Sequence, residues 1–401
     1  MSMPSTRNKI GRNYVLQNIS GDAGNWHLPD TIFRSWDKPI SLIAEDDSKS
    51  VKGFRSVQLG AIYAIKSHWT VSALPATVVM PTGTGKTETM IATILSERCE
   101  KTLIMVPTVL LRDQTVKKCA SLGVLNDIGV IPAKLLYPAV GCLRKKPADS
   151  NELEEIIKES NIIVITVALL KNFDDKYMAL LIKNCSTLII DEAHHIAANT
   201  WSEIKNKFSK MRCLQFTATP YRNDGKKIDG KIIYNFPLGL AQRQNYFQPI
   251  SFVPIHEFDG DKSDLAVAQY AVNALDEDIK NRYSHVLLVR AKSKERANFL
   301  FEKIYKQQYA KHNPVLILSG MGERNKKESL KKIETLESRI LVCVDMFGEG
   351  IDIPNLKIAA IHDKYKSLPI TLQFVGRFAR SKAGLGDCKR QCKCHSFRQL
   401  K

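Results

Sequence analysis

The stretch of sequence that decides the fold occupies residues 80–87 and reads Met80-Pro81-Thr82-Gly83-Thr84-Gly85-Lys86-Thr87. It follows a short β-branched run at 77–79 and precedes a segment of helical character at 88–95. A strand, a glycine-rich loop and a helix in this order are the context of a phosphate-binding loop. The glycines leave room for backbone N–H groups to surround phosphate oxygens. We therefore expect a nucleoside triphosphate site here.

The side chains of this loop have the chemistry that such a site needs. Lys86 would place its charge on the β- and γ-phosphates, and the Thr87 hydroxyl would bind Mg²⁺. Residues 82–85 would supply the backbone of the cradle, and the dipole of the following helix favours an anion. Met80 stands where the pattern usually has its first glycine. The alternative interpretation is a glycine turn beside an unrelated Lys-Thr pair.

Length and composition set limits on the remaining chain. At 401 residues it is long for one domain, and two or three are expected. A net charge of +18 favours a polyanionic partner, although charge alone does not choose between DNA, RNA and an anionic membrane surface. The longest apolar run, 162–170, is too short to span a bilayer, and the polar start has no signal-peptide character. Nine cysteines, most in apolar segments, are typical of reduced core residues. We expect a cytoplasmic protein with no membrane partner.

Short β-rich runs alternate with helical segments from residue 77 onward. This alternation predicts parallel sheets flanked by helices, an α/β fold. The interval 223–248 is rich in Gly, Asp, Lys and Asn, which predicts a connection between two α/β halves. The strands are expected at 77–80, 102–106, 162–166, 187–190 and 214–217 in the first half, and at 285–289, 315–319, 339–344 and 357–361 in the second. Helices are expected at 152–159, 292–306 and 323–337.

A second motif follows the apolar run 188–190, where Asp191 and Glu192 precede Ala193 and His194. Carboxylates after a parallel strand lie at the edge of the sheet where such folds bind ligands. Asp191 would hold Mg²⁺ through water, and Glu192 would orient and deprotonate the attacking water. An exposed acidic turn is the alternative interpretation.

The glycine loop followed by Asp-Glu-Ala-His resembles the superfamily 2 helicases and translocases, in particular the motors of type I and type III restriction enzymes and the excision-repair helicases. Further motifs occur in the order of that family, over about residues 50 to 385. The matching residues are Phe54, Arg55 and Gln58; Val106-Pro107-Thr108; Thr217-Ala218-Thr219-Pro220; Gly348-Glu349-Gly350-Ile351-Asp352; and Gln373-Phe374-Val375-Gly376-Arg377-Phe378-Ala379-Arg380.

The resemblance implies two tandem RecA-like domains that hold ATP and Mg²⁺ in the cleft between them. The first domain would be 51–235 and the second 236–401, after an N-terminal extension, 1–50, of unknown role. Phe54, Arg55 and Gln58 would read the adenine, because an amide can pair with its edge. On periodicity alone, an exposed Arg and Gln on a helix is the alternative.

The resemblance also assigns roles to residues of the later motifs. Thr108 would contact the nucleic-acid backbone, while Thr217 and Thr219 would couple hydrolysis to strand movement. Gly350 and Asp352 would help to bind the nucleotide. Gln373, Arg377 and Arg380 would act in catalysis, since arginines three apart on a helix project from one face and can stabilise the charge of the transition state.

The implied function is ATP-driven movement on nucleic acid, with duplex DNA favoured because Thr219-Pro220-Tyr221-Arg222 is similar to the restriction and repair motors. One alternative is an RNA helicase with the same chemistry. Another is a nucleotide-gated DNA-binding subunit of a restriction or defence complex, with little turnover. No nuclease motif is evident, so a nuclease or other defence or repair subunit is an expected partner.

The end of the chain departs from the family pattern. Cys388, Cys392, Cys394 and His395 could ligate zinc, but their spacing is tighter than in a usual closed finger. We expect instead a solvated basic tail or an altered terminus, with a second domain that lacks its last elements.

Overall fold

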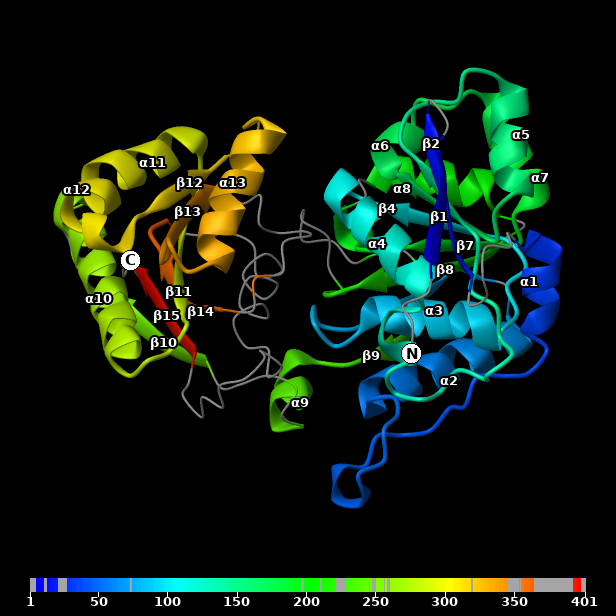
Figure 1. The fold of residues 1–401 in the computed structure, drawn as a ribbon, viewed down its shortest axis with the longest axis horizontal. Coiled ribbons are helices and arrows are strands. Elements are labelled where there is room, and N and C mark those ends of the chain that lie inside the picture. Colours follow the sequence, from blue (N-terminus) through cyan, green and yellow to red (C-terminus); the bar gives the residue numbers. More distant parts are fainter. Residues whose placement is uncertain are drawn as a thin grey trace. The chain divides into compact units, whose positions relative to one another are not determined.

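The computed structural model describes residues 5–10, 13–20, 27–72, 74–195, 198–209, 211–220, 228, 230–244, 246, 250–255, 257, 260–318, 320–344, 353, 355–363 and 392–397. The chain divides into two units, unit 1 (Met1–Pro237) and unit 2 (Leu238–Lys401). Each unit contains a largely parallel sheet with helices against its faces (Figure 1). Within the described ranges, none of the helices combines the length and the apolar character that crossing a membrane requires.

Unit 1 is built on a sheet of nine strands in the order β1-β2-β5-β6-β4-β7-β8-β3-β9. The seven strands from β5 to β9 in that order are parallel, and the hairpin β1–β2 adds two antiparallel strands at one edge. The strands are β1 (Ser5–Ile10), β2 (Tyr14–Ser20), β3 (Ala76–Val79), β4 (Thr102–Val106), β5 (Val140–Leu143), β6 (Ile162–Thr166), β7 (Thr187–Ile190), β8 (Arg212–Thr217) and β9 (Lys231–Asn235).

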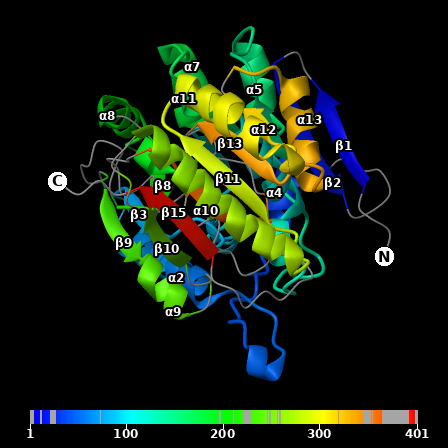
Figure 2. The ribbon, with the colours of Figure 1, turned by 90° about the vertical axis from the view of Figure 1, so that its left-hand side faces the viewer.

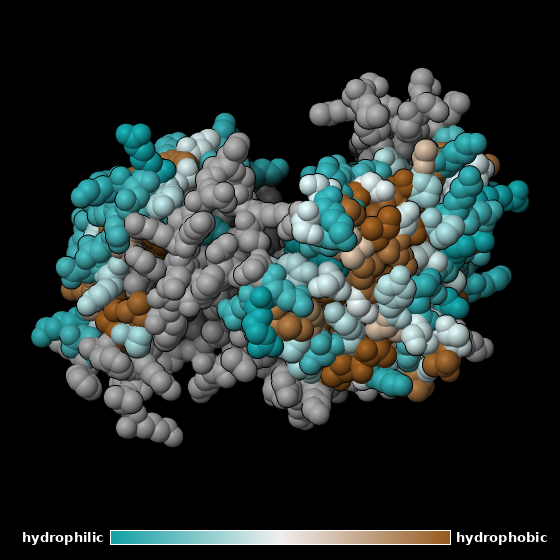
Figure 3. All heavy atoms as spheres, turned by 90° about the horizontal axis from the view of Figure 1, so that it is seen from below, coloured by the Kyte–Doolittle hydropathy of each residue, from teal (hydrophilic) through white to brown (hydrophobic). Residues whose placement is uncertain are grey.

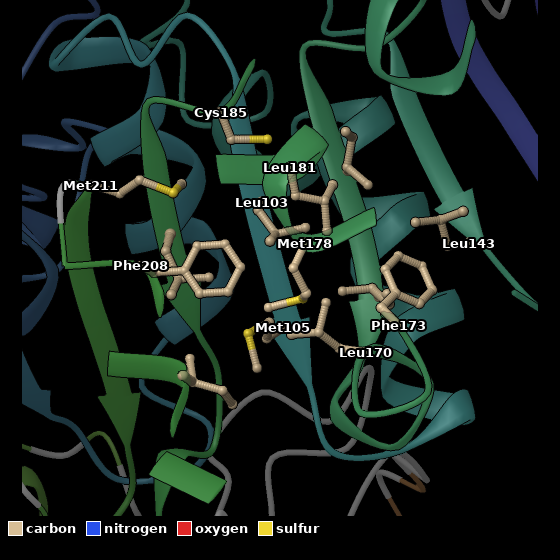
Figure 4. Packing of buried hydrophobic residues seen from close by; sticks show 14 of the residues in the cluster. Leu103, Met105, Leu143, Leu170, Phe173, Met178, Leu181, Cys185, Phe208 and Met211 are labelled. Atoms are coloured by element: carbon tan, nitrogen blue, oxygen red, sulfur yellow. The ribbon is translucent and has the colours of Figure 1, made fainter. Parts of the chain in front are cut away.

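Helices cover both faces of this sheet. One face carries α5 (Ser150–Lys158), α7 (Asp175–Asn184) and α8 (Ala198–Lys207), whose apolar residues share one buried cluster with β4, β6 and β7 (Figure 4). The other face carries α2 (Ser56–Val71), α3 (Lys86–Ser96) and α4 (Val109–Ser121). The short helices α1 (Pro29–Ser35) and α6 (Val167–Leu170) complete the unit. Because both faces are covered, the central strands are buried along their whole length and read as continuous apolar runs.

Unit 2 has a second sheet of six strands, all parallel, in the order β10-β15-β14-β11-β13-β12. Figure 2 shows α10 (Gly260–Lys280) lying across this sheet. Together with α11 (Lys294–Phe299), α10 covers one face, and α13 (Glu323–Glu334) packs on the other. The strands are β10 (Ile250–Ile255), β11 (Val286–Ala291), β12 (Val315–Ile317), β13 (Ile340–Val344), β14 (Leu356–Ile361) and β15 (Cys392–Phe397), and the remaining helices are α9 (Leu238–Arg243) and α12 (Lys306–Gln308).

Large apolar side chains are exposed to solvent on α2 and just after it. Tyr63 is 52% exposed and Val71 81% exposed, and Leu74 just beyond the helix is 65% exposed. Figure 3 shows apolar side chains gathered on a face of unit 1 among hydrophilic ones. The helix is therefore only weakly amphipathic, since its buried face, with Val57 and Ile65, is apolar as well.

Burial also explains the cysteines. Six are free and buried, which confirms the prediction of reduced core thiols for them: Cys99, Cys119, Cys142, Cys185, Cys213 and Cys343. Burial raises the pKa of Cys119 to about 12, so its thiol stays protonated and unreactive near neutral pH.

Most predicted strands are observed, and those at 102–106, 162–166 and 187–190 have the expected bounds. The interval 223–248, predicted as a connection, contains the division between the two units after Pro237. It also contains β9 and α9, which were not predicted. The strand was missed because β9 is at the edge of the sheet and is half-exposed, so its sequence contains polar residues.

The two ends of the chain also contain more structure than the sequence indicated. Residues 5–10 and 14–20 form the hairpin β1–β2 of the first sheet. Residues 392–397, which we expected in a solvated basic tail, form β15 between β10 and β14. Alternation of polar and apolar residues is weak in both segments, so tertiary pairing decides their structure.

The buried face of β4 allows a test of the unit 1 core. Leu103 is fully buried in the cluster of Figure 4, and we expect Leu103→Ala to lower the free energy of unfolding by about 3 kcal/mol through lost contacts and a residual cavity. All four tryptophans lie in unit 1, so tryptophan fluorescence during urea denaturation reports on this unit. The matched control is Leu28→Ala, because Leu28 is 64% exposed. Equal effects of the two substitutions would contradict the packing described.

Candidate nucleotide-binding site

The glycine loop connects β3 to α3 at the carboxyl edge of the first sheet. Gly83 and Gly85 have φ angles of 90° and 93°, in the left-handed region that glycine adopts without strain. The buried Thr84 hydroxyl donates a hydrogen bond of 2.7 Å to the carbonyl oxygen of Pro81, which closes the loop on itself. The helix begins at Lys86, so its first N–H groups are directed towards the loop.

Residues at the start of α2 contact this loop. The Arg55 guanidinium donates to the Gly83 carbonyl oxygen at 3.2 Å, and the Gln58 amide nitrogen lies 3.5 Å from the Gly85 carbonyl oxygen. The Gln58 amide oxygen accepts the backbone N–H of Arg55 at 2.9 Å, and Phe54 is fully buried. Gln58 is only 7% exposed, unlike the exposed helix residue of the alternative interpretation. The structure therefore places Arg55 and Gln58 beside the loop, and Phe54 directly precedes Arg55 in the chain.

An ion pair joins the loop to the second motif. The Lys86 ammonium lies 2.9 Å from a carboxylate oxygen of Glu192, with side chains only 7% and 12% exposed. The same ammonium is 3.5 Å from the Met80 carbonyl oxygen. Glu192 has a φ angle of 49°, a left-handed conformation that is unusual for a residue with a side chain, and its N–H donates to the Asp191 carboxylate at 2.9 Å. A positive and two negative side chains thus occupy one buried region.

The sheet topology explains why residues 100 positions apart meet. β7, β8 and β3 are parallel neighbours, so their carboxyl ends lie at one edge. Asp191 continues the pairing of β7 by donating its N–H to the Met105 carbonyl oxygen at 2.9 Å. Met80 continues β3 by donating to the Thr217 carbonyl oxygen at 2.9 Å. The loop and the acidic pair are consequently held by the same backbone ladder.

His194 connects this group with Thr217 at the end of β8, and no role was predicted for His194 from the sequence. His194 lies with its Nδ1 atom 3.0 Å from the Thr217 hydroxyl and 3.5 Å from the second carboxylate oxygen of Glu192. The Thr217 hydroxyl donates to the Thr219 carbonyl oxygen at 2.8 Å. His194 is 2% exposed, so it connects Glu192 with both threonines inside the protein. Its position two residues after Glu192, in the run Asp191-Glu192-Ala193-His194, was the available signal.

The other predicted site residues are placed as follows. Thr82 and Thr87 are half-buried in the loop. Thr108 caps α4, where its hydroxyl accepts the Leu111 N–H at 3.3 Å. Gly350, Asp352, Gln373, Arg377 and Arg380 lie outside the described residues.

The residues at this edge fit a nucleotide with its metal ion. The loop backbone at Gly85 has no room for a side chain, because an added Cβ would lie 2.2 Å from the Gln58 amide nitrogen. The hydroxyl of Thr87 and the carboxylate of Asp191 are oxygen ligands, which Mg²⁺ prefers. Lys86 supplies the positive charge that a phosphate needs.

Comparison with known proteins agrees with this geometry. Residues 52–222 match the family model of the type III restriction enzyme res subunit, and residues 270–382 match that of the helicase conserved C-terminal domain. The chain belongs to the superfamily 2 helicases and translocases.

Two curated relatives of this chain have names that refer to different nucleic acids. The chain is 24% identical, over 76% of its length and 74% of the relative, to the protein named DNA 3'-5' translocase XPB2 of Sulfurisphaera tokodaii. It is 24% identical, over 76% of its length and 57% of the relative, to a protein of Acanthamoeba polyphaga mimivirus described as the ATP-dependent RNA helicase L396. The chain spans about half the length of the curated viral relatives that it matches, 47% and 57%.

A solved structure supports the fold assignment. A fragment described as the HsdR subunit of a type I restriction enzyme from Vibrio vulnificus aligns with 98% of this chain and 75% of its own, with a TM-score of 0.61 and 16% identity. At this identity the similarity shows the fold, that of tandem RecA-like domains.

The close approach of Gln58 to Gly85 can be tested without nucleotide. We expect Gly85→Ala to destabilise unit 1 by more than Gly129→Ala, because both glycines have positive φ but an added Cβ at Gly129 would meet nothing within 4 Å. The Gly129 variant therefore measures the backbone strain alone, about 1 kcal/mol.

The steric part is isolated by a double-mutant cycle followed by tryptophan fluorescence in urea. Gly85→Ala is expected to be less destabilising in a Gln58→Ala background than in the unaltered chain. An equal effect in both backgrounds would show that the two side chains do not compete for the same space.

Proposed function

We propose that this helicase hydrolyses ATP with Mg²⁺ and uses the energy to move on nucleic acid, with duplex DNA as the favoured track. The observation that carries the proposal is the buried ion pair of Lys86 with Glu192, at 2.9 Å beside the glycine loop. A buried pair of this kind adds little to stability, so its presence beside the loop is better explained by chemistry.

The proposed roles follow from the positions of the side chains. Lys86, released from Glu192, binds the β- and γ-phosphates, and the loop N–H groups of residues 82–87 surround them. Glu192 then orients the attacking water and accepts its proton. Thr87 and Asp191 would hold Mg²⁺, which neutralises phosphate charge. His194 contacts both Glu192 and Thr217, which supports a coupling role for Thr217 and Thr219.

Two site predictions rest on the family resemblance, since their residues lie outside those described. The two are catalysis by Gln373, Arg377 and Arg380, and nucleotide binding by Gly350 and Asp352. Contact of Thr108 with the nucleic-acid backbone is likewise proposed, because Thr108 lies at the carboxyl end of β4, next to β7 in the sheet.

DNA is favoured as the track because the first family model and the HsdR neighbour belong to restriction enzymes, which suggests a restriction, defence or repair complex with a nuclease or other subunit as partner. RNA is the second candidate, favoured by the similarity to the viral protein described as an RNA helicase. The net charge of +18 suits either polymer, and binding should weaken steeply as salt rises.

Steady-state ATP hydrolysis measured alone and with duplex DNA, single-stranded DNA or RNA tests this proposal. We expect duplex DNA to stimulate turnover most, and Lys86→Ala to reduce the stimulated rate at least a hundredfold because the phosphates lose their charge partner. Lys66→Ala is the matched control, since Lys66 pairs with Glu97 on the surface of the same unit. Stimulation by RNA alone would favour the RNA helicase. ATP-dependent DNA binding with background turnover would favour a nucleotide-gated clamp.

Substitution of Gln58 tests its reading of adenine. Its amide contacts the loop in this structure and would also pair with the base under the proposal, so Gln58→Ala tests both functions. We expect the KM for ATP to rise about tenfold with a smaller rise in the KM for GTP, because the amide pairs with the adenine edge. Equal rises for ATP and GTP would show that Gln58 only supports the loop.

A further inference from the structure

Five polar side chains form one cluster at the carboxyl edge of the second sheet, apart from every motif that the proposed function uses. Figure 2 shows α10, α11 and β11, three of the elements that meet there. The members are Asp264 on α10, Arg296 on α11, Tyr305 in the π-helical turn Leu300–Tyr305, and His362 and Asp363 immediately after β14. We call this set the β14 cluster.

One branch of the β14 cluster is a chain of hydrogen bonds through His362. Its Nδ1 atom lies 2.9 Å from a carboxylate oxygen of Asp264, and its Nε2 atom lies 2.8 Å from the Tyr305 hydroxyl. With a neutral imidazole, Nδ1 donates to the carboxylate and Nε2 accepts from the hydroxyl. Both ring nitrogens therefore have partners, although the His362 side chain is completely buried.

The other branch centres on Arg296. Its guanidinium donates to the same Asp264 oxygen and, at 3.3 Å, to the carboxylate of Asp363. The second Asp363 oxygen accepts the backbone N–H of Lys292 at 2.9 Å, just beyond the end of β11. Arg296 thus connects α10 with the residue that follows β14, and Asp363 connects that residue with β11.

The β14 cluster is buried as well as charged. The exposed fractions of the side chains are 6% for Asp264, 7% for Asp363 and 23% for Arg296. Burial alone would raise the pKa of Asp264, but hydrogen bonds from His362 and Arg296 outweigh it and lower that pKa, so the carboxylate stays ionised. Apolar residues could fill this space at no loss of stability, whereas a fully bonded polar network fixes one arrangement.

The backbone also departs from regular structure to build the β14 cluster. Tyr305 ends a π-helical turn between α11 and α12. Such turns are rare and are found frequently at functional sites, where they change the direction of a side chain. Here the turn accompanies the contact of Tyr305 with His362. The buried ionic network and the π-helical turn therefore meet at His362.

The position of these two residues in the chain indicates what they serve. Asp363 lies two residues after the end of β14. Gln373 and Arg377 follow Asp363 by 10 and 14 positions. Ends of parallel strands carry the reacting groups in α/β folds, and a small displacement of such a group lowers a rate strongly.

We propose that Arg296, with Asp264 and Asp363 as its two acceptors, is a positioning residue for ATP hydrolysis, holding the point from which the chain continues to Gln373 and Arg377. This inference rests on the proposed function. Arg296 itself touches no substrate in this scheme. It acts through Asp363, whose carboxylate is held between the guanidinium and the Lys292 N–H.

Two variants test the proposal in the full chain. Arg296→Lys keeps the charge but replaces the two separate nitrogens that contact Asp264 and Asp363 by a single ammonium nitrogen, and Asp363→Asn keeps the shape while it weakens the bond to Arg296. We expect each to reduce the kcat of polymer-stimulated ATP hydrolysis roughly tenfold, with the KM for ATP within about twofold of the unaltered chain. In both variants, the Lys292 amide should exchange its hydrogen faster.

Arg339→Lys is the matched control, because Arg339 is half-buried and bonds the carbonyl oxygens of Tyr283 and His285 at the amino end of β13. It makes the same chemical change at the opposite edge of the same sheet. We expect it to lower the thermal midpoint in calorimetry at least as much as Arg296→Lys, with an unchanged kcat.

The outcomes separate the two proposals. If the unaltered chain hydrolyses ATP and both cluster variants match Arg339→Lys in kcat, the positioning role is wrong and the proposed function stands. A rise in KM at constant kcat would also overturn the positioning role. If the unaltered chain hydrolyses no ATP with any polymer, the proposed function fails, and this inference fails with it.

Discussion

Parallel pairing of β7, β8 and β3 is the constraint on which the candidate site depends. The hydrogen bonds of these strands bring three carboxyl ends to one edge, so Asp191, Thr217 and the loop after Met80 become neighbours. The ladder continues past the strands through the N–H groups of Asp191 and Met80. Were one of these strands antiparallel, its following residues would lie at the other edge, and Lys86 could not reach Glu192.

A buried ion pair or ionic network lies at the carboxyl edge of each sheet. Lys86 faces Glu192 in the first sheet, and Arg296 faces Asp264 and Asp363 in the second. In each case a single change would leave a buried charge without its counterpart, which destabilises strongly. The left-handed backbone of Glu192 adds strain of about 1–3 kcal/mol. Strain and buried charge at one residue are typical of a position kept for chemistry rather than for stability.

The two units share one architecture but carry different side chains at the carboxyl edges of their sheets. In unit 1 the carboxyl edge contains the glycine loop, the acidic pair and His194, all of which suit a nucleotide. In unit 2 the corresponding edge contains the β14 cluster, whose charged side chains are bonded to one another. This arrangement suits a role in holding the neighbouring segments in place. The fold is thus common to both, and the side chains after each strand decide what each edge does.

The sequence by itself determined the parallel α/β class, the central strands and the loop at 80–87. It could do so because buried parallel strands are continuous apolar runs, and because a phosphate cradle needs glycine at fixed spacing. It did not reveal β9 or β15, since edge strands and weakly patterned segments take their structure from the neighbour that pairs with them. Only the tertiary structure brought His194 to Thr217, Gln58 to Gly85, and Asp264 to His362 across 98 positions. Such contacts join residues far apart in the chain, and no local pattern records them.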